Sequence, residues 1–164
     1  MRIWVDAAGE SRHIAMVASY DGKTVYCHCR SPDEWWNILA ERGDHQIGNQ
    51  EMLSIVLALE SVPKEVLDGA CVTLFCDNEG VLHSMIKGSS RCTETNQMIG
   101  RCWYQIMRRR IGLHLLRVQS KANIAYLPSR KEFLLLKLVG ATEIEAVLPS
   151  WLENIWDIPE FMDF

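Results

Sequence analysis

The sequence predicts an α/β fold in which a mixed five-stranded sheet is flanked by helices. Asp21-Gly22 joins two strand-like runs, and this dipeptide in that position is a strong hairpin signal. After residue 70, strand-like runs alternate with helical patterns, which is typical of parallel strands with helical connections. A length of 164 residues with 48% hydrophobic residues suits one domain with one sizeable core.

The first half of the chain is expected to open with a three-stranded antiparallel meander. The expected strands span residues 2–8, 12–20 and 23–29. Ser31 as N-cap and Pro32 at the first helical position predict a short helix that ends at Gly43. After a loop over residues 43–50, the run 51–62 is apolar on most sides and predicts a buried helix.

The second half is expected to add two strands and three helices to this meander. The run "CVTLFCDN" at 71–78 is almost wholly apolar, which predicts a central strand that is buried on both faces. The remaining predictions are a helix at 79–88 with Gly88 as C-cap, a helix at 93–110, a strand at 113–120 and a helix at 123–140 that includes Pro128. We expect one domain over residues 1–140 and, over 141–164, a C-terminal extension whose short helices pack on it.

Composition limits the cellular setting of the chain. No apolar run approaches the ~18 residues that span a bilayer, and the N-terminal "MRIWVDAAGES" lacks the apolar stretch of a secretory signal. The six cysteines include no CxxC pair, which favours reduced structural thiols. We therefore expect an intracellular protein, cytoplasmic or nuclear, with no membrane partner.

Basic residues are concentrated in one segment of an acidic chain. Residues 86–131 contain ten Lys or Arg and a single acid, Glu94, although the whole chain has a net charge of −4. Such a segment is the charge pattern of a surface that follows phosphates. The alternative is a solvated helix face together with polar strand ends.

Three carboxylates stand at unusual positions in this pattern. Asp6 lies inside the first strand, Glu51 opens an apolar helix, and Asp77 closes a buried strand. Each has an ordinary explanation, since Asp6 could end its strand in a turn, Glu51 could favour the helix dipole and Asp77 could cap the next helix. Together at one sheet edge they would repel one another unless a divalent cation neutralised them, and oxygen ligands suit Mg²⁺ or Mn²⁺.

Four segments resemble the ribonuclease H family, most closely the ribonuclease H domains that follow reverse transcriptases in retroelements. They are "WVDAAGE", "GNQEMLSIVLALE", "LFCDNEGVLHSMIKGSS" and "RVQSKANIAYLPSR", in the family order over residues 2–140. The resemblance implies a ribonuclease H-like fold and metal-dependent cleavage of the RNA strand in RNA–DNA hybrids. It also implies a reverse transcriptase domain of the same polyprotein as a partner.

The resemblance assigns the metal site residue by residue, with one departure. In the family, an Asp-Glu-Asp-Asp set binds two Mg²⁺ ions, and its first three positions fall on Asp6, Glu51 and Asp77 as catalytic and metal-ligating residues. The fourth falls on Tyr126, where relatives usually have an aspartate within "NIADxPSR". A phenol is neutral near pH 7 and is a poor ligand for a hard cation, so we expect a weakened second metal. Asn123, three residues earlier on the same helical side, offers an amide oxygen as a substitute ligand, but it is not a convincing one.

Further residues are candidates for contacts with a nucleic acid. They are Asn78, Ser89, Ser90, Arg108, Arg109, Arg110, Lys121 and Arg130. Small polar groups can approach a phosphate or a ribose 2′-hydroxyl, and arginines pair with phosphate. Their alternative is ordinary cap, turn and surface chemistry.

Three functional interpretations stay open at this level. The first is a ribonuclease H with a weakened second metal site. The second is a catalytically silent module that binds nucleic acid or supports a reverse transcriptase. The third is a variant of an active enzyme in which an aspartate at position 126 has been replaced.

Overall fold

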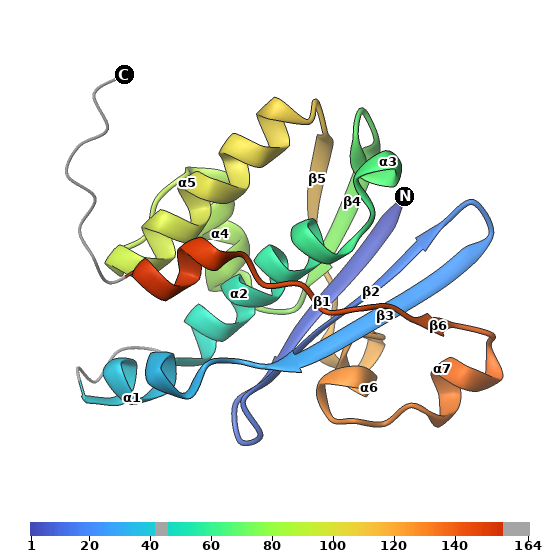
Figure 1. Ribbon diagram of the computed structural model, residues 1–164, viewed down its shortest axis with the longest axis horizontal. Coiled ribbons are helices and arrows are strands. Elements are labelled where there is room, and N and C mark those ends of the chain that lie inside the picture. Colours follow the sequence, from blue (N-terminus) through green and yellow to red (C-terminus); the bar gives the residue numbers. More distant parts are fainter. Residues whose placement is uncertain (42–45, 156–164) are drawn as a thin grey trace.

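A computed structural model describes residues 1–41 and 46–155, which form a six-stranded mixed sheet covered by helices (Figure 1). The order across the sheet is β5-β4-β1-β2-β3-β6. The strands are β1 (Arg2–Ala8), β2 (His13–Tyr20), β3 (Lys23–Arg30), β4 (Cys71–Cys76), β5 (Gly112–Arg117) and β6 (Thr142–Glu143). The predicted α/β class with a mixed sheet is confirmed, whereas the predicted number of five strands is wrong. The additional strand β6 pairs in parallel with β3 at the edge of the sheet.

The predicted meander forms the antiparallel part of the sheet. β1 pairs with β2, and β2 pairs with β3 in antiparallel register. Asp21 and Gly22 join β2 to β3 and have φ angles of 48° and 73°. Positive φ at both central residues is the requirement of a tight type I′ hairpin, which explains why Asp-Gly occupies this turn.

The parallel part of the sheet positions two of the candidate acids. β4 runs parallel to both β1 and β5, with Trp4 opposite Phe75. Two residues further along each strand, the same register brings Asp6 and Asp77 level with one another. The carboxyl ends of these parallel strands therefore lie at the same edge of the sheet.

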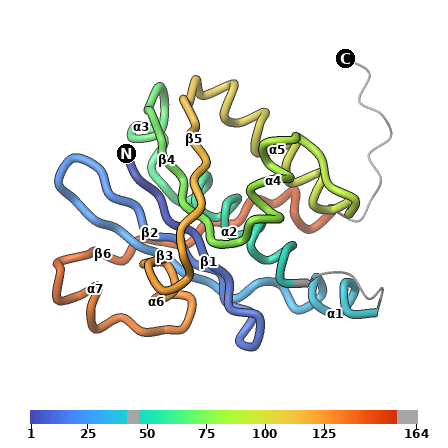
Figure 2. Tube along the Cα trace, turned by 180° about the vertical axis from the view of Figure 1, so that it is seen from behind, coloured from blue at the N-terminus to red at the C-terminus, as the bar shows by residue number. Residues whose placement is uncertain are grey.

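Helices cover both faces of the sheet (Figures 1 and 2). They are α1 (Asp33–Glu41), α2 (Gln46–Ser61), α3 (Lys64–Leu67), α4 (Glu79–Lys87), α5 (Thr93–Arg108), η1 (Ser120–Ala122), α6 (Tyr126–Ser129), α7 (Leu134–Leu138) and η2 (Ser150–Asn154). On one face α2 packs against β1 and β2 and is itself covered by α5, which encloses the main core. On the other face α6 packs against β1, β2 and β3 over a smaller core that includes Val17, Tyr26, Ala125 and Leu136.

The helix that contains Glu51 begins earlier than predicted. α2 starts at Gln46, so that residues 46–50 of the predicted loop are helical and Glu51 lies in the second turn. Two buried amides support this start, because Gln50 Nε2 donates to Ser31 Oγ at 3.2 Å and Asn49 Oδ1 accepts a hydrogen bond from the hydroxyl of Thr95. These partners come from distant segments, and no local pattern indicated them. The predicted end of the preceding helix at Gly43 lies outside the described residues.

The predicted helix at 123–140 is wrong, because the structure replaces it with α6, a turn and α7. Asn123 Oδ1 accepts a hydrogen bond from the N–H of Ala125, which competes with helix formation at the start of the segment. Lys131 adopts a left-handed conformation with φ 60° just after α6. α5 likewise ends at Arg108 instead of residue 110, because Arg110 is left-handed with φ 55°, and β5 ends at Arg117 instead of residue 120.

Part of the predicted C-terminal extension packs on the rest of the chain. Besides β6, it contains η2, and Leu152 and Ile155 are buried in the main core. Residues 156–164 of this extension lie outside the described part of the chain. Among the described residues, none of the helices has the length and apolar character needed to span a bilayer.

Candidate metal centre

Asp6 lies near the end of β1 with only 2% of its surface exposed. Its Oδ2 atom accepts a hydrogen bond from the hydroxyl of Ser129 and forms an ion pair of 2.7 Å with Nη1 of Arg130. Burial raises the pKa of Asp6; Ser129 and Arg130 lower it, and the nearby Asp77 raises it. Ser129 and Arg130, which lie more than a hundred residues further along the sequence, therefore offset part of the cost of burying this carboxylate.

Glu51 approaches the same edge of the sheet from α2 and is 4% exposed. Its Oε1 atom accepts a hydrogen bond from the backbone N–H of Ala7 at 3.3 Å. Burial raises the pKa of Glu51 to about 9, and the charges of Asp6 and Asp77 add to this effect. Without a cation nearby, this carboxyl group keeps its proton at neutral pH.

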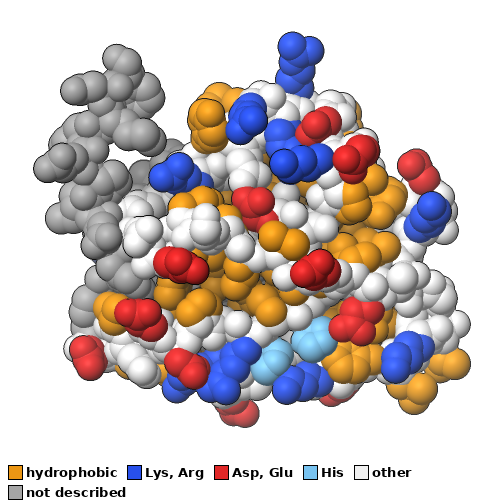
Figure 3. Space-filling model, in the orientation of Figure 1, with side chains coloured by type: hydrophobic (Ala, Val, Ile, Leu, Met, Phe, Trp, Pro, Cys, Tyr) orange, Lys and Arg blue, Asp and Glu red, His pale blue; other side chains and the backbone are white. Residues whose placement is uncertain are grey.

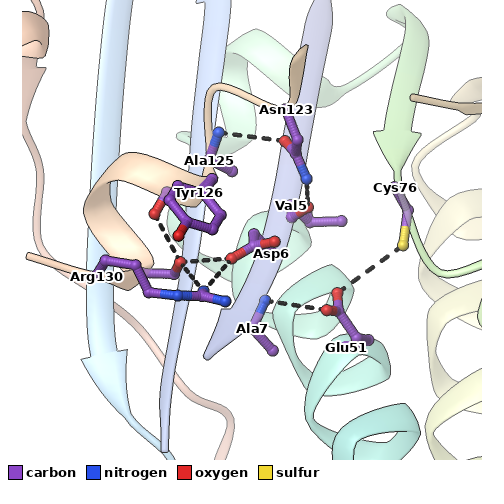
Figure 4. Close-up of polar contacts among 10 residues, drawn as sticks. Val5, Asp6, Ala7, Glu51, Cys76, Asn123, Ala125, Tyr126 and Arg130 are labelled. Atoms are coloured by element: carbon purple, nitrogen blue, oxygen red, sulfur yellow. Dashed lines mark hydrogen bonds and ion pairs between the residues drawn. The ribbon is translucent and has the colours of Figure 1, made fainter. Parts of the chain in front are cut away.

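Asp77 brings the third predicted acid to this place, directly after β4. Ligand atoms of Glu51, Cys76 and Asp77 all lie within 4.8 Å of one another. Asp6 lies close enough for its charge to affect Glu51, and Figure 4 shows it between Arg130 on one side and Glu51 on the other. The three predicted carboxylates therefore converge from β1, α2 and the end of β4.

Cys76 is a neighbour of this cluster that sequence reasoning treated only as a structural thiol. Its Sγ atom lies 4.0 Å from Oε2 of Glu51. Burial raises the pKa of the Cys76 thiol, with the charge of Glu51 adding to it. Carboxylate oxygens supply two of the three grouped ligands and suit Mg²⁺ or Mn²⁺, whereas a thiolate of Cys76 would favour a softer metal. The position of Cys76 immediately before Asp77 was the available signal.

Tyr126 and Arg130 lie on the other side of Asp6 and form a stacked pair. The guanidinium carbon of Arg130 lies 4.4 Å from the centre of the Tyr126 ring. Tyr126 begins α6, and Arg130 follows the end of the same helix, so one helical turn brings the two side chains together. A cation and an aromatic ring thus occupy the side of Asp6 where the resemblance had placed a fourth acidic ligand.

Asn123 is not available as a substitute for the missing acid. Its Nδ2 atom donates to the carbonyl oxygen of Val5 at 2.8 Å, and its Oδ1 atom accepts from the N–H of Ala125 at 3.2 Å. The side chain is 3% exposed. Nδ2 therefore fastens the segment before α6 to β1, and Oδ1 holds the backbone at Ala125 within that segment.

A groove of about 400 Å³ is lined by residues of α2, α4 and α5, and Asn78, which follows Asp77 in the chain, is one of them. The candidate residues Asn78 and Ser90 line it, and so do polar residues that sequence reasoning missed: Asn49, Ser84, Arg91 and Thr95. Asn78 also caps α4, because its Oδ1 atom accepts from the N–H of Val81 at 3.1 Å. Ser89 lies at the end of α4, where its N–H donates to the carbonyl of Ser84.

The arginines at the end of α5 lie in a different part of the fold. Arg109 forms an ion pair of 2.7 Å with Asp68 and donates to the carbonyl oxygen of Leu59 at 3.1 Å. Arg108 and Arg109 line a second groove of about 320 Å³ that contains acids as well as bases. Figure 3 shows basic and acidic side chains interspersed on one face of the molecule.

Lys121 lies apart from these arginines, in η1. It lines a third groove, of about 530 Å³, together with Tyr126. The basic segment of the sequence is therefore divided, and Lys121 and Arg130 are the two candidate cations that flank Tyr126.

Comparison with models of known protein families gives no match to this chain. A search of curated proteins likewise finds no protein of significant similarity.

Proposed function

We propose that this chain is a metal-dependent endoribonuclease of the ribonuclease H type, which cleaves the RNA strand of RNA–DNA hybrids. The observation that supports this most is the convergence of Asp6, Glu51 and Asp77 at one sheet edge. Three buried or half-buried carboxylates together are costly unless a cation joins them. The order of the elements, with an antiparallel meander followed by parallel strands that alternate with helices, agrees with the ribonuclease H-like fold that we propose for residues 1–140.

Glu51 and Asp77, whose ligand atoms lie within 4.8 Å of one another, have the donor chemistry to hold one divalent cation, Mg²⁺ or Mn²⁺, with Asp6 beside them. When bound, such a cation polarises the phosphate and lowers the pKa of a coordinated water. The residues do not fit a second cation equally well, because Tyr126 offers a phenol and Arg130 already places a positive charge on Asp6. We therefore propose that one cation binds at Glu51 and Asp77, and that a second cation, beside Asp6 and Tyr126, binds only weakly.

The first groove supports a nucleic acid as the ligand. Asn78, the residue after Asp77, and Ser90 line it, and Arg91 adds a positive charge. Amide and hydroxyl groups can donate to or accept from a ribose 2′-hydroxyl, which is the group that distinguishes RNA from DNA. In this arrangement the groove positions one strand while Asp77 lies at the reacting phosphate.

A second candidate function is a silent module that binds the hybrid or supports a reverse transcriptase domain of the same polyprotein. The pairing of Arg130 with Asp6 and Tyr126 favours it, because this pairing fills the side of the site that a second cation needs. Under either function we place the protein in an intracellular compartment, where its six free thiols would stay reduced.

Cleavage of a labelled RNA–DNA hybrid tests the proposal. We expect the RNA strand to be cut in Mn²⁺ and to stay intact in EDTA. Asp77→Asn keeps the size of the side chain and removes its charge, so the rate should fall by about a hundredfold or more. Glu132→Gln removes an exposed acid outside the site and serves as the matched control. A hybrid that binds to the folded protein but stays intact in Mn²⁺ would favour the silent module.

A further inference from the structure

Arg130 is fixed by three neighbours at the edge of the acidic site. Its Nη1 atom contacts Asp6 at 2.7 Å and Ser129 Oγ at 2.6 Å, and its guanidinium group lies over the ring of Tyr126 (Figure 4). Ser129 in turn donates to Asp6, so the acid, the hydroxyl and the guanidinium form a closed set. A planar cation held in this way has a defined position and orientation.

This position gives the site a permanent positive charge next to its most buried acid. A divalent cation that used Asp6 on the same side would have to displace the guanidinium or lie against it, and like charges at such short range repel strongly. On the other side of the cluster, no Lys or Arg of the described residues forms a hydrogen bond or ion pair with Glu51 or Asp77, and only the more distant charge of Arg130 lowers the pKa of Glu51. The site is therefore electrostatically asymmetric.

We propose that Arg130 takes the place of a second metal ion, so that the site uses one divalent cation together with one guanidinium group. The divalent cation is held toward Glu51 and Asp77, and Arg130 binds an oxygen atom of a phosphodiester in the bound strand. This inference rests on the proposed function, because it assigns a ligand to the same site.

The geometry leaves Arg130 able to make the phosphate contact. Within the described residues, its hydrogen bonds to side chains use Nη1, and about a third of the side chain is exposed (32%). A guanidinium group has five N–H donors in a fork that matches phosphate, so the remaining donors can reach a ligand. The ring of Tyr126 supports the face of this guanidinium.

Counting bound metal ions tests the first half of this inference without any measurement of cleavage. Mn²⁺ is titrated into the protein, and free Mn²⁺ is followed by electron paramagnetic resonance. We expect one ion per chain in the wild type and in Arg130→Lys, which keeps the charge. Arg130→Gln frees Asp6, so it should bind a second ion or bind the first at least fivefold more tightly. Lys131→Gln removes a neighbouring exposed charge and should match the wild type.

The opposite outcomes are distinct. Two ions of similar affinity in the wild type would overturn the inference and leave the proposed function standing. Identical titrations of the wild type and Arg130→Gln, including the absence of binding in both, would also overturn it. One ion in the wild type and a second in Arg130→Gln, without cleavage of any hybrid, would leave the metal-binding half of the inference standing and reject the proposed cleavage. Circular dichroism confirms that each variant is folded.

Salt dependence of hybrid binding in EDTA tests the phosphate contact. Each neutralised phosphate contributes about one unit to the slope of log affinity against log salt. Arg130→Gln should lower this slope by about one, whereas Arg130→Lys should retain it. An unchanged slope in Arg130→Gln would show that Arg130 is only an internal ion-pair partner of Asp6, and this would overturn the phosphate contact.

Discussion

The two sides of the acidic site differ in how their charge is balanced. The acidic half is the group of Glu51, Cys76 and Asp77, whose ligand atoms lie within 4.8 Å of one another. Burial raises the pKa of Glu51 in this half to about 9. The paired half is the group of Asp6, Tyr126, Ser129 and Arg130. It contains its own cation, because Nη1 of Arg130 lies 2.7 Å from Oδ2 of Asp6. One half thus keeps a proton in place of a cation, and the other half has a cation of its own. The difference teaches that a buried carboxylate can be stabilised in two ways within one cluster, and that only the acidic half calls for an added ion.

The largest expected effect comes from making the paired half acidic. Tyr126→Asp adds a carboxylate beside Asp6, so two acids face one guanidinium and a second cation gains a ligand. We expect hybrid cleavage in Mg²⁺ to rise by about ten- to a hundredfold, which corresponds to roughly 1.4–2.8 kcal/mol of barrier. In Mn²⁺, the cleavage rates of Tyr126→Asp and the wild type should differ less than they do in Mg²⁺. Tyr126→Phe keeps the ring without adding a ligand and should match the wild type. A folded but equally slow Tyr126→Asp protein would show that this half does not limit the rate.

The acidic half predicts a pH dependence of stability in metal-free protein. The pKa of Glu51 is about 9 in the folded state, against an ordinary value of 4.5. The folded chain therefore keeps a proton that the unfolded chain loses, so stability falls as the pH rises from about 4.5 toward 9. Glu51→Gln removes this loss and should be more stable than the wild type by roughly 1–3 kcal/mol at pH 8.

Urea unfolding in EDTA at pH 4 and pH 8 measures this difference. The two proteins should converge at pH 4, where Glu51 is protonated in both the folded and the unfolded states. If the free energies of unfolding of the wild type and Glu51→Gln differ by the same amount at both pH values, the difference comes from packing and not from the titration of Glu51. Glu132→Gln, at an exposed acid, is the matched control.

A smaller effect is expected where the paired half is fastened to the sheet. Asn123→Ala removes hydrogen bonds to the carbonyl of Val5 and from the N–H of Ala125, both of them buried. Leaving these groups without partners should cost about 1–2 kcal/mol of unfolding free energy. Thermal or urea unfolding measures this, with Ser120→Ala at an exposed position as the control. If Asn123→Ala unfolds like the wild type, the segment before α6 is held by packing alone.

The smallest effect, on the apparent affinity for a cation, is expected at Cys76, whose neutral thiol lies beside Glu51. Cys76→Ser replaces sulfur by oxygen with little change in shape. If carboxylate oxygens hold the cation, the apparent Mn²⁺ affinity should change by less than about threefold. Isothermal calorimetry with Mn²⁺ and with Zn²⁺ measures this. A large loss of Zn²⁺ binding alone would identify Cys76 as a thiolate ligand and move the acidic half toward softer metals.

Short-range signals in the sequence were enough for much of the framework. Asp21-Gly22 indicated the hairpin because its two positive φ angles suit few other dipeptides. An acid inside the first strand and an acid that closes the buried strand were identified as unusual, and the parallel pairing of β1 with β4 in the folded chain brings Asp6 and Asp77 to one edge. Glu51 was also identified, although its place in the second turn of α2 was not, because Asn49 and Gln50 find their partners only in the folded chain.

What the sequence determined by itself is therefore the sheet class, the tight hairpin and the identity of the three acids. The tertiary structure alone decided that 123–140 is broken into α6 and α7, that β6 completes the sheet, and that Arg130 pairs with Asp6. The physical reason is range. Hairpins and strand ends follow from neighbouring residues, whereas the partner of a buried charge is chosen among groups that meet only after folding, here across 124 positions of the chain.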